Sequence, residues 1–109
     1  MKTLLAIVLL VSVSVGVTVR GHTLDTPLRT SPTSDDITVY TDDNIIYNIV
    51  TRKHKRNYDS SKKYLMDKYG KPQTVEYEGG TGHGFFTKGA IISMRITGKY
   101  VYISYTSLK

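Results

Sequence analysis

The stretch IISMRITGKYVYISYT, residues 91–106, decides the fold. Gly98 and Lys99 divide it into two runs rich in β-branched and aromatic residues, and glycine suits the first central position of a two-residue hairpin turn. With this turn every second cross-strand pair is apolar on both strands: Ile96 with Val101, Met94 with Ile103, and Ile92 with Tyr105. A slip of one residue would destroy this match, so the sequence predicts an antiparallel hairpin with one buried face.

Outward from this hairpin, the sequence predicts three more strands and one helix. The strands are expected at residues 37–40, 45–51 and 73–78, and the helix at residues 58–69. Tyr58, Leu65 and Tyr69 recur on one face at helical spacing, and Gly70 followed by Pro72 predicts the end of the helix. The fold class is therefore α+β: a small antiparallel β-sheet with one helix packed on a face, in the order β-β-α-β-β-β.

The first residues have the composition of a secretory signal peptide. Residues 3–19 carry no charge and follow Lys2, as is typical of the apolar region of such a peptide. We expect residues 1–21 to be a signal peptide that is cleaved after Gly21, with cleavage after Gly16 as the alternative. An uncleaved membrane anchor is the other interpretation, although hydroxyl residues dilute the apolar run. The protein is thus expected to be secreted and extracellular, with no stable membrane insertion after cleavage.

The remaining chain divides into two parts. Residues 22–34 hold two of the three prolines and many serines and threonines, which predicts a disordered linker or a propeptide. Residues 35–109 are expected to form the domain, which has no cysteine and must rely on an apolar core for its stability. The three histidines, His22, His54 and His83, have no recognised metal spacing, so neither a metal nor a cofactor is expected.

A dense run of positive charge leads into the predicted helix. Between positions 52 and 71 the chain has eight Lys or Arg residues and two Asp residues. Such a patch attracts an anionic surface, a glycan, a nucleic acid or an acidic protein. The predicted binding residues are Arg52, Lys53, Lys55, Arg56, Lys62, Lys63, Arg95 and Tyr102. Two other interpretations stay open: a solvated loop that maintains solubility, and a dibasic processing site at Lys55-Arg56.

The tyrosines of the final hairpin form a second candidate binding surface. Tyr100, Tyr102 and Arg95 are expected on one face of the sheet, where aromatic rings beside arginine can stack on bases or sugars. The structural alternative is that strands simply favour tyrosine and that this face packs beneath the helix.

Residues 78–86, EGGTGHGFF, form the stretch most like a motif. A dinucleotide-binding loop needs a helix directly after its glycines, because the helix N-terminus supplies the N–H groups. Here strand-like sequence follows instead. We therefore expect a mobile connector in which the glycines reverse the chain, His83 lies at the tip, and Phe85 or Phe86 anchors the loop on the core.

One catalytic set needs consideration. Glu76 or Glu78, His83 and Arg95 could supply an acid, a base and a cationic clamp, as in small secreted ribonucleases that use these residue types on an antiparallel sheet beside a helix. No motif of those enzymes is matched.

The function predicted from the sequence is a secreted, basic, non-enzymatic binding protein of effector, inhibitor or host-defence type. The alternatives are a secreted nuclease that uses this catalytic set, and a proprotein that releases a basic antimicrobial fragment. The pattern predicts no oligomeric state.

Overall fold

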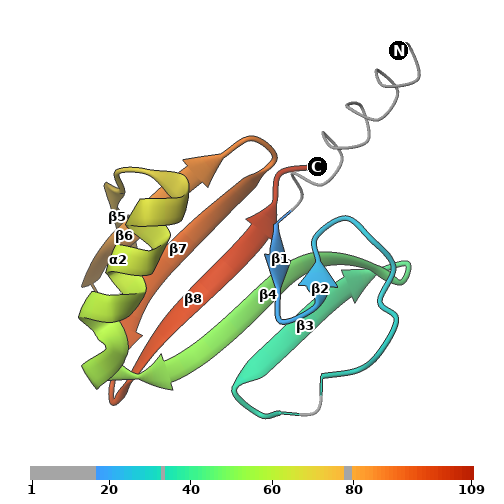
Figure 1. The fold of residues 1–109 in the computed structure, drawn as a ribbon, viewed down its shortest axis with the longest axis horizontal. Coiled ribbons are helices and arrows are strands. Elements are labelled where there is room, and N and C mark those ends of the chain that lie inside the picture. The colour runs from blue at the N-terminus through green and yellow to red at the C-terminus, as the bar shows by residue number, and fades with distance from the viewer. Residues whose placement is uncertain (1–16, 33, 78–79) are drawn as a thin grey trace, which may run out of the picture.

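The computed structural model describes residues 17–32, 34–77 and 80–109. These residues form a six-stranded antiparallel sheet, a separate two-stranded sheet and one α-helix (Figure 1). The elements in chain order are β1 (Thr18–Val19), β2 (His22–Thr23), β3 (Ile37–Asp42), β4 (Ile45–His54), the 3-10 helix η1 (Lys55–Asn57), α2 (Tyr58–Tyr69), β5 (Gln73–Tyr77), β6 (Gly80–Thr87), β7 (Ala90–Thr97) and β8 (Tyr100–Ser107). The strand order of the large sheet is β3-β4-β8-β7-β6-β5. The α+β class predicted from the sequence is confirmed.

The β7–β8 hairpin has the predicted register. Thr97 pairs with Tyr100 across the turn, and Met94 pairs with Ile103 further along. Gly98 has a φ of 64°, a left-handed conformation that glycine adopts without a steric cost. The turn chemistry and the alternation of apolar residues therefore select the same pairing. Of the paired apolar residues, Ile96 is 47% exposed at the turn end, and the others are buried.

Helix α2 begins and ends at the predicted residues. Leu65 is fully buried, and Tyr58 and Tyr69 pack against the core at its two ends. Gly70 follows with a φ of 95° and its N–H donates to the Met66 carbonyl, which is a glycine-based helix end. The four-residue spacing of the buried positions thus places α2 along one face of the sheet.

Strand β6 corrects the prediction of a mobile connector over residues 80–86, and residues 78 and 79 of that prediction lie outside the described part of the chain. Gly80–Thr87 is a strand that pairs with β5 on one side and β7 on the other. Glycine has a low strand propensity, but here the ladders on both sides supply hydrogen bonds. Phe85 is fully buried, whereas Phe86 is 47% exposed. A Cβ at Gly84 would lie 3.2 Å from Val75 Cγ1, so the glycine permits close packing. The large sheet therefore follows the order β-β-α-β-β-β-β, one strand more than expected.

The segment before the large sheet contains a second, smaller sheet. Strands β1 and β2 form a short hairpin, and its flanking residues Val17 and Leu24 are buried in the core. The Leu24 N–H donates to the Val17 carbonyl at 3.0 Å. Backbone hydrogen bonds also join this segment to residues 44–46: the Asp25 N–H donates to the Ile46 carbonyl at 2.7 Å, and the Leu28 N–H donates to the Asn44 carbonyl at 3.0 Å. The disordered linker or propeptide at residues 22–34 stays a prediction. The signal peptide boundary at residue 21 stays a prediction.

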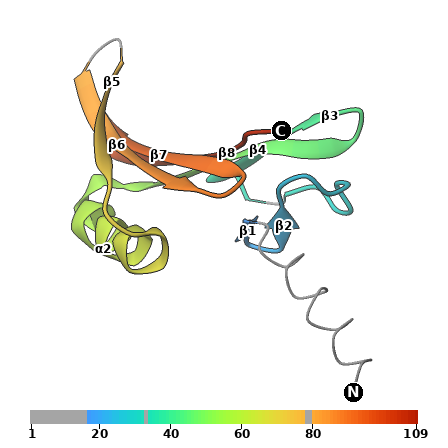
Figure 2. The same cartoon turned by 90° about the horizontal axis from the view of Figure 1, so that it is seen from above.

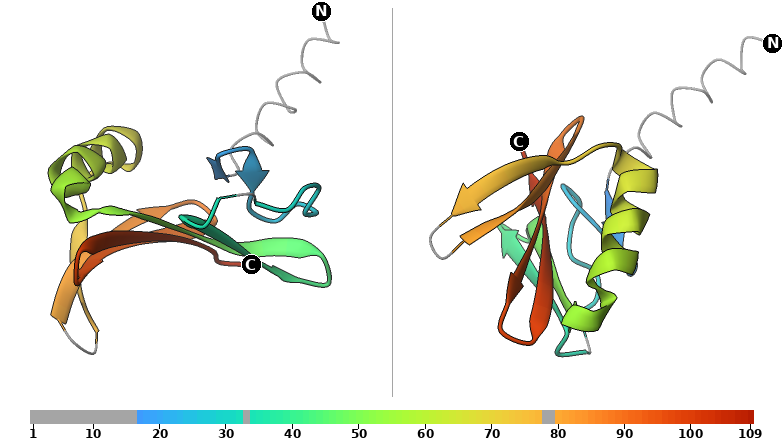
Figure 3. Two further views of the ribbon diagram at one scale, coloured as in Figure 1. Left: turned by 90° about the horizontal axis from the view of Figure 1, so that it is seen from below. Right: turned by 90° about the vertical axis from the view of Figure 1, so that its left-hand side faces the viewer.

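The two sides of the large sheet are not equivalent. Figure 2 shows α2 and the β1–β2 hairpin on the same side, which we call the covered face. No described helix or hairpin lies over the other side, the open face, as the two views of Figure 3 also show. Because residues alternate along each strand, neighbouring side chains in one strand belong to different faces.

Candidate functional site

A row of charged and aromatic residues crosses the open face. Tyr102 of β8 lies between Arg52 of β4 and Arg95 of β7 as the cross-strand partner of both. Their neighbours in sequence, Val101 and Met94, are buried on the covered face, so the alternation directs the row away from α2. The expectation that the tyrosine face packs beneath the helix is therefore wrong, and the row is open to a partner.

The aromatic rings beside this row are held in place by their neighbours. The Arg52 guanidinium carbon lies 4.6 Å from the centroid of the Tyr100 ring, a distance typical of a cation–π contact. The Tyr100 and Tyr102 ring centroids are 6.3 Å apart with an interplanar angle of 68°, which is an edge-to-face arrangement. Tyr100 is 36% exposed. A ligand would thus meet ordered rings flanked by guanidinium groups.

More positive charge collects where β4 meets η1. The Lys55 N–H donates to the Lys99 carbonyl at 2.8 Å, which joins the start of η1 to the β7–β8 turn. In the same place the Arg56 N–H donates to His54 Nδ1 at 3.0 Å. We define the basic corner as the cations gathered at this end of the sheet: Arg52, Lys55, Arg56, Arg95 and Lys99. The sequence prediction missed Lys99, whose only signal was its position in a predicted turn.

The other lysines predicted to bind lie on the covered face and on helix α2. Lys53 pairs with Val101 and so belongs to the covered face, away from Arg52. Lys62 and Lys63 lie on α2, where Lys63 Nζ is 3.1 Å from an Asp67 carboxylate oxygen. The basic run from residue 52 to residue 71 is therefore distributed over three surfaces: the basic corner, the covered face and α2. Only the basic corner adjoins the tyrosine row.

The candidate catalytic residues are not brought together. His83 pairs with Met94, so it lies on the covered face, whereas Arg95 is on the open face. Glu76 pairs with Thr81 on the edge strand, on the same face as His83, and Glu78 lies outside the described residues. The structure thus places the histidine and the cationic clamp on opposite sides of the sheet.

The surroundings of His83 are those of a packed side chain. Its ring centroid is 6.2 Å from that of Tyr58. Burial lowers the pKa of His83, and the positive charge of Lys62 lowers this pKa further. The neutral imidazole is therefore favoured at neutral pH, beside the end of α2 that begins at Tyr58.

The described part of the chain has neither a metal-binding cluster nor a membrane-spanning helix. Within residues 17–32, 34–77 and 80–109, no group of three or more histidine or acidic side chains is placed to hold a metal ion. In the same residues, no helix is both long enough and apolar enough to cross a membrane.

Comparison with known proteins identifies no relative. No family model matches the sequence, and no curated protein or solved structure is significantly similar to the chain.

Proposed function

We propose that the protein is a non-enzymatic binding protein that engages an anionic polymer through the basic corner and the tyrosines beside it. The observation that carries this proposal is the row of Arg52, Tyr102 and Arg95 across three neighbouring strands. The same proposal includes secretion, which is predicted from the signal peptide. Such a protein suits the role of an effector, an inhibitor or a host-defence factor that acts on an anionic surface.

The spacing of the row suits a ligand with repeated charges. Arg52 and Arg95 are separated by one strand, and neighbouring strands lie about 5 Å apart, so their backbones are about 10 Å from each other. A polymer with regularly spaced sulfates or phosphates can contact both guanidinium groups and release counterions from each contact. The rings of Tyr100 and Tyr102 between and beside them offer apolar area to a sugar or a base.

The expected polymer is a sulfated glycan, because the proposed route of export leads to the extracellular space. Single-stranded nucleic acid has the same charge and also stacks on tyrosine, so it is the competing outcome. The two are separated by titrating the protein with a heparin oligosaccharide and with an oligonucleotide of similar charge at the same ionic strength. Tighter binding of the oligonucleotide would identify nucleic acid, rather than a glycan, as the partner.

The experiment that tests the site is elution from heparin at rising salt concentration. Arg52→Gln and Arg95→Gln should each elute at lower salt than the wild type, and the double variant at lower salt still. Lys88→Gln removes the same charge in the turn at the other end of β7 and is the matched control. Equal elution of the wild type, the two single arginine variants and the double variant would contradict the basic corner as the binding site.

The enzymatic alternative is tested separately by incubating the purified protein with RNA. Because His83 and Arg95 lie on opposite faces, we expect no cleavage that depends on His83. Cleavage that is lost in His83→Ala would support the nuclease alternative.

A further inference from the structure

The covered face has a cleft that the proposed polymer site does not use. It lies between α2 and the β1–β2 hairpin, over strands β4 and β8, and has a volume of about 400 Å³. Figure 1 shows strand β8 between α2 and the β1–β2 hairpin. Sites for small molecules have volumes of about 300–1,000 Å³, so the cleft can hold one small organic molecule.

The charges around the cleft have one sign. Arg20, Lys53 and Lys68 line it, and none of its lining residues is an acid. Arg20 forms a bidentate pair with Asp36, at 2.8 and 3.1 Å. Within the described residues Lys53 and Lys68 have no carboxylate partner, so two ammonium groups at the cleft are available to an anion.

Hydroxyl groups complete the lining. Tyr105 of β8 lies at the floor and Tyr69 of α2 lies at the wall, and burial raises the pKa of both phenols. Both therefore stay protonated and can donate hydrogen bonds. Lys68 Nζ donates to the Tyr64 hydroxyl at 3.3 Å and lies 5.7 Å from the centroid of the Tyr69 ring. Ser61 adds a hydroxyl from α2, whereas the Ser60 hydroxyl at the rim donates to the Asn57 carbonyl at 3.1 Å.

We propose that this cleft binds a small organic phosphate or sulfate monoester. Such an ester has a compact anion with three terminal oxygen acceptors, which suits ammonium groups surrounded by hydroxyl donors. Its organic part has the size of a sugar or a nucleoside. The rings of the tyrosines and the side chain of Ile103 supply an apolar surface for that part.

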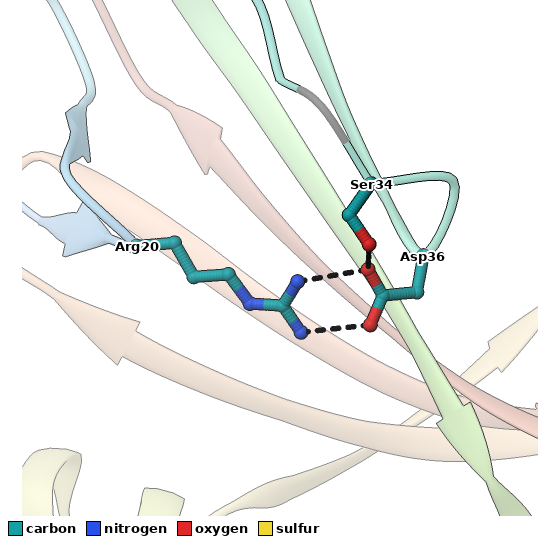
Figure 4. Close-up of polar contacts among 3 residues, drawn as sticks. All are labelled: Arg20, Ser34 and Asp36. Atoms are coloured by element: carbon teal, nitrogen blue, oxygen red, sulfur yellow. Dashed lines mark hydrogen bonds and ion pairs between the residues drawn. The ribbon is translucent and has the colours of Figure 1, made fainter.

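The proposal requires residues 17–21 to remain in the protein. Thr18, Val19 and Arg20 form the hairpin wall of the cleft, and the pair between Arg20 and Asp36 fixes that wall to the start of β3 (Figure 4). Cleavage of the leader after Gly21 removes the wall, whereas cleavage after Gly16 retains it. Mass spectrometry of the secreted protein should show that residues 17–21 are present. A secreted chain that begins at His22 would overturn the proposal.

The binding test is calorimetric titration of the secreted protein with glucose 6-phosphate and with adenosine monophosphate. Glucose and adenosine are the neutral controls, and the two esters distinguish a sugar ligand from a nucleotide ligand. Lys53→Gln and Lys68→Gln should each weaken binding of at least one ester about tenfold, the effect of one lost charged hydrogen bond. Lys63→Gln, on the outer side of α2, and Arg95→Gln, on the open face, should leave the affinity unchanged.

Three results would overturn the proposal. They are the absence of binding of either ester at millimolar concentration, equal affinity for the neutral controls, and affinities that Lys53→Gln and Lys68→Gln do not change. A loss of ester binding in Arg95→Gln would place the anion on the open face and would also count against the cleft. Failure of these tests leaves elution from heparin untouched, since that site is on the other side of the sheet.

Discussion

The two faces of the large sheet use the same strands but have different chemistry. In β8 the covered face receives Val101, Ile103 and Tyr105, all buried, while the open face receives Tyr100 and Tyr102. The covered face therefore supplies most of the hydrophobic stabilisation, which grows with the apolar area removed from water. The open face contributes little to the core and is available for a partner. Successive residues of one strand thus serve different purposes: one contributes to the core and the next is available for recognition.

The largest expected effect is that of Phe85→Ala on the covered face. Phe85 is fully buried, so truncation leaves a cavity and should lower the free energy of unfolding by about 3–5 kcal/mol. Phe86→Ala is the matched control on the open face, and a loss below about 1 kcal/mol is expected there. Urea denaturation monitored by circular dichroism measures both. Similar losses in the two variants would break the distinction between the faces.

The next effect tests whether the segment before β3 belongs to the core. Leu24 is buried, whereas Leu108 is 56% exposed. Leu24→Ala should lower the free energy of unfolding by about 2–4 kcal/mol, because the side chain leaves a void beneath the β1–β2 hairpin. Leu108→Ala should change it by less than about 0.5 kcal/mol. If Leu24→Ala is as mild as its control, the segment before β3 does not contribute to the core of the covered face.

A smaller effect that depends on pH is expected at Asp36. The hydrogen bonds from Arg20 and then Ser34 hold the pKa of this carboxyl well below its usual range. A carboxyl with a lowered pKa in the folded state stabilises the fold above about pH 4 and loses this effect as the pH falls through the folded-state pKa. Asp36→Asn should therefore be less stable than the wild type at pH 7, with the gap closing on acidification. Asp35→Asn is the control, and a gap that is constant from pH 7 to pH 2 would contradict the role of the pair.

The smallest effect is expected on the outer side of α2. The pair between Lys63 and Asp67 is strongly exposed, so Lys63→Ala should cost only about 0.3–0.5 kcal/mol. Elution from heparin should differ little from that of the wild type, since Lys63 lies on the helix rather than in the basic corner. A shift as large as that of Arg95→Gln would show that the polymer also reaches the covered side.

The fold was predictable where local signals agreed. The turn at Gly98 and the alternation on both sides of it determine one register, and the spacing of Leu65 and Tyr69 determines one helix face. Strand β6 was not predictable, because its glycines favour loops and only the ladders on both sides make it a strand. The pairing of β4 with β8 also leaves no local signal, since the two strands are far apart in sequence.

The candidate site was predictable in its residue types but not in its grouping. The basic run is continuous in sequence, yet alternation along β4 sends Arg52 and Lys53 to opposite faces. Lys99 joins the basic corner only because its carbonyl accepts a hydrogen bond from the Lys55 N–H. Cleft residues such as Tyr69 and Arg20 come from segments that no sequence pattern connects.

The position of β8 between β4 and β7 has a consequence for how the chain folds during synthesis. Strands β5 to β8 form a meander of neighbours in sequence, whereas Asn48 of β4 and its hydrogen-bonded partner Ser104 are 56 positions apart. Closing so long a loop is slow, because its entropy is lost before the contacts form. During synthesis, β4 can therefore pair with its second neighbour only after β8 has been made. During that time the β3–β4 hairpin has a free edge toward other nascent chains, so a chaperone that shields this edge should raise the yield.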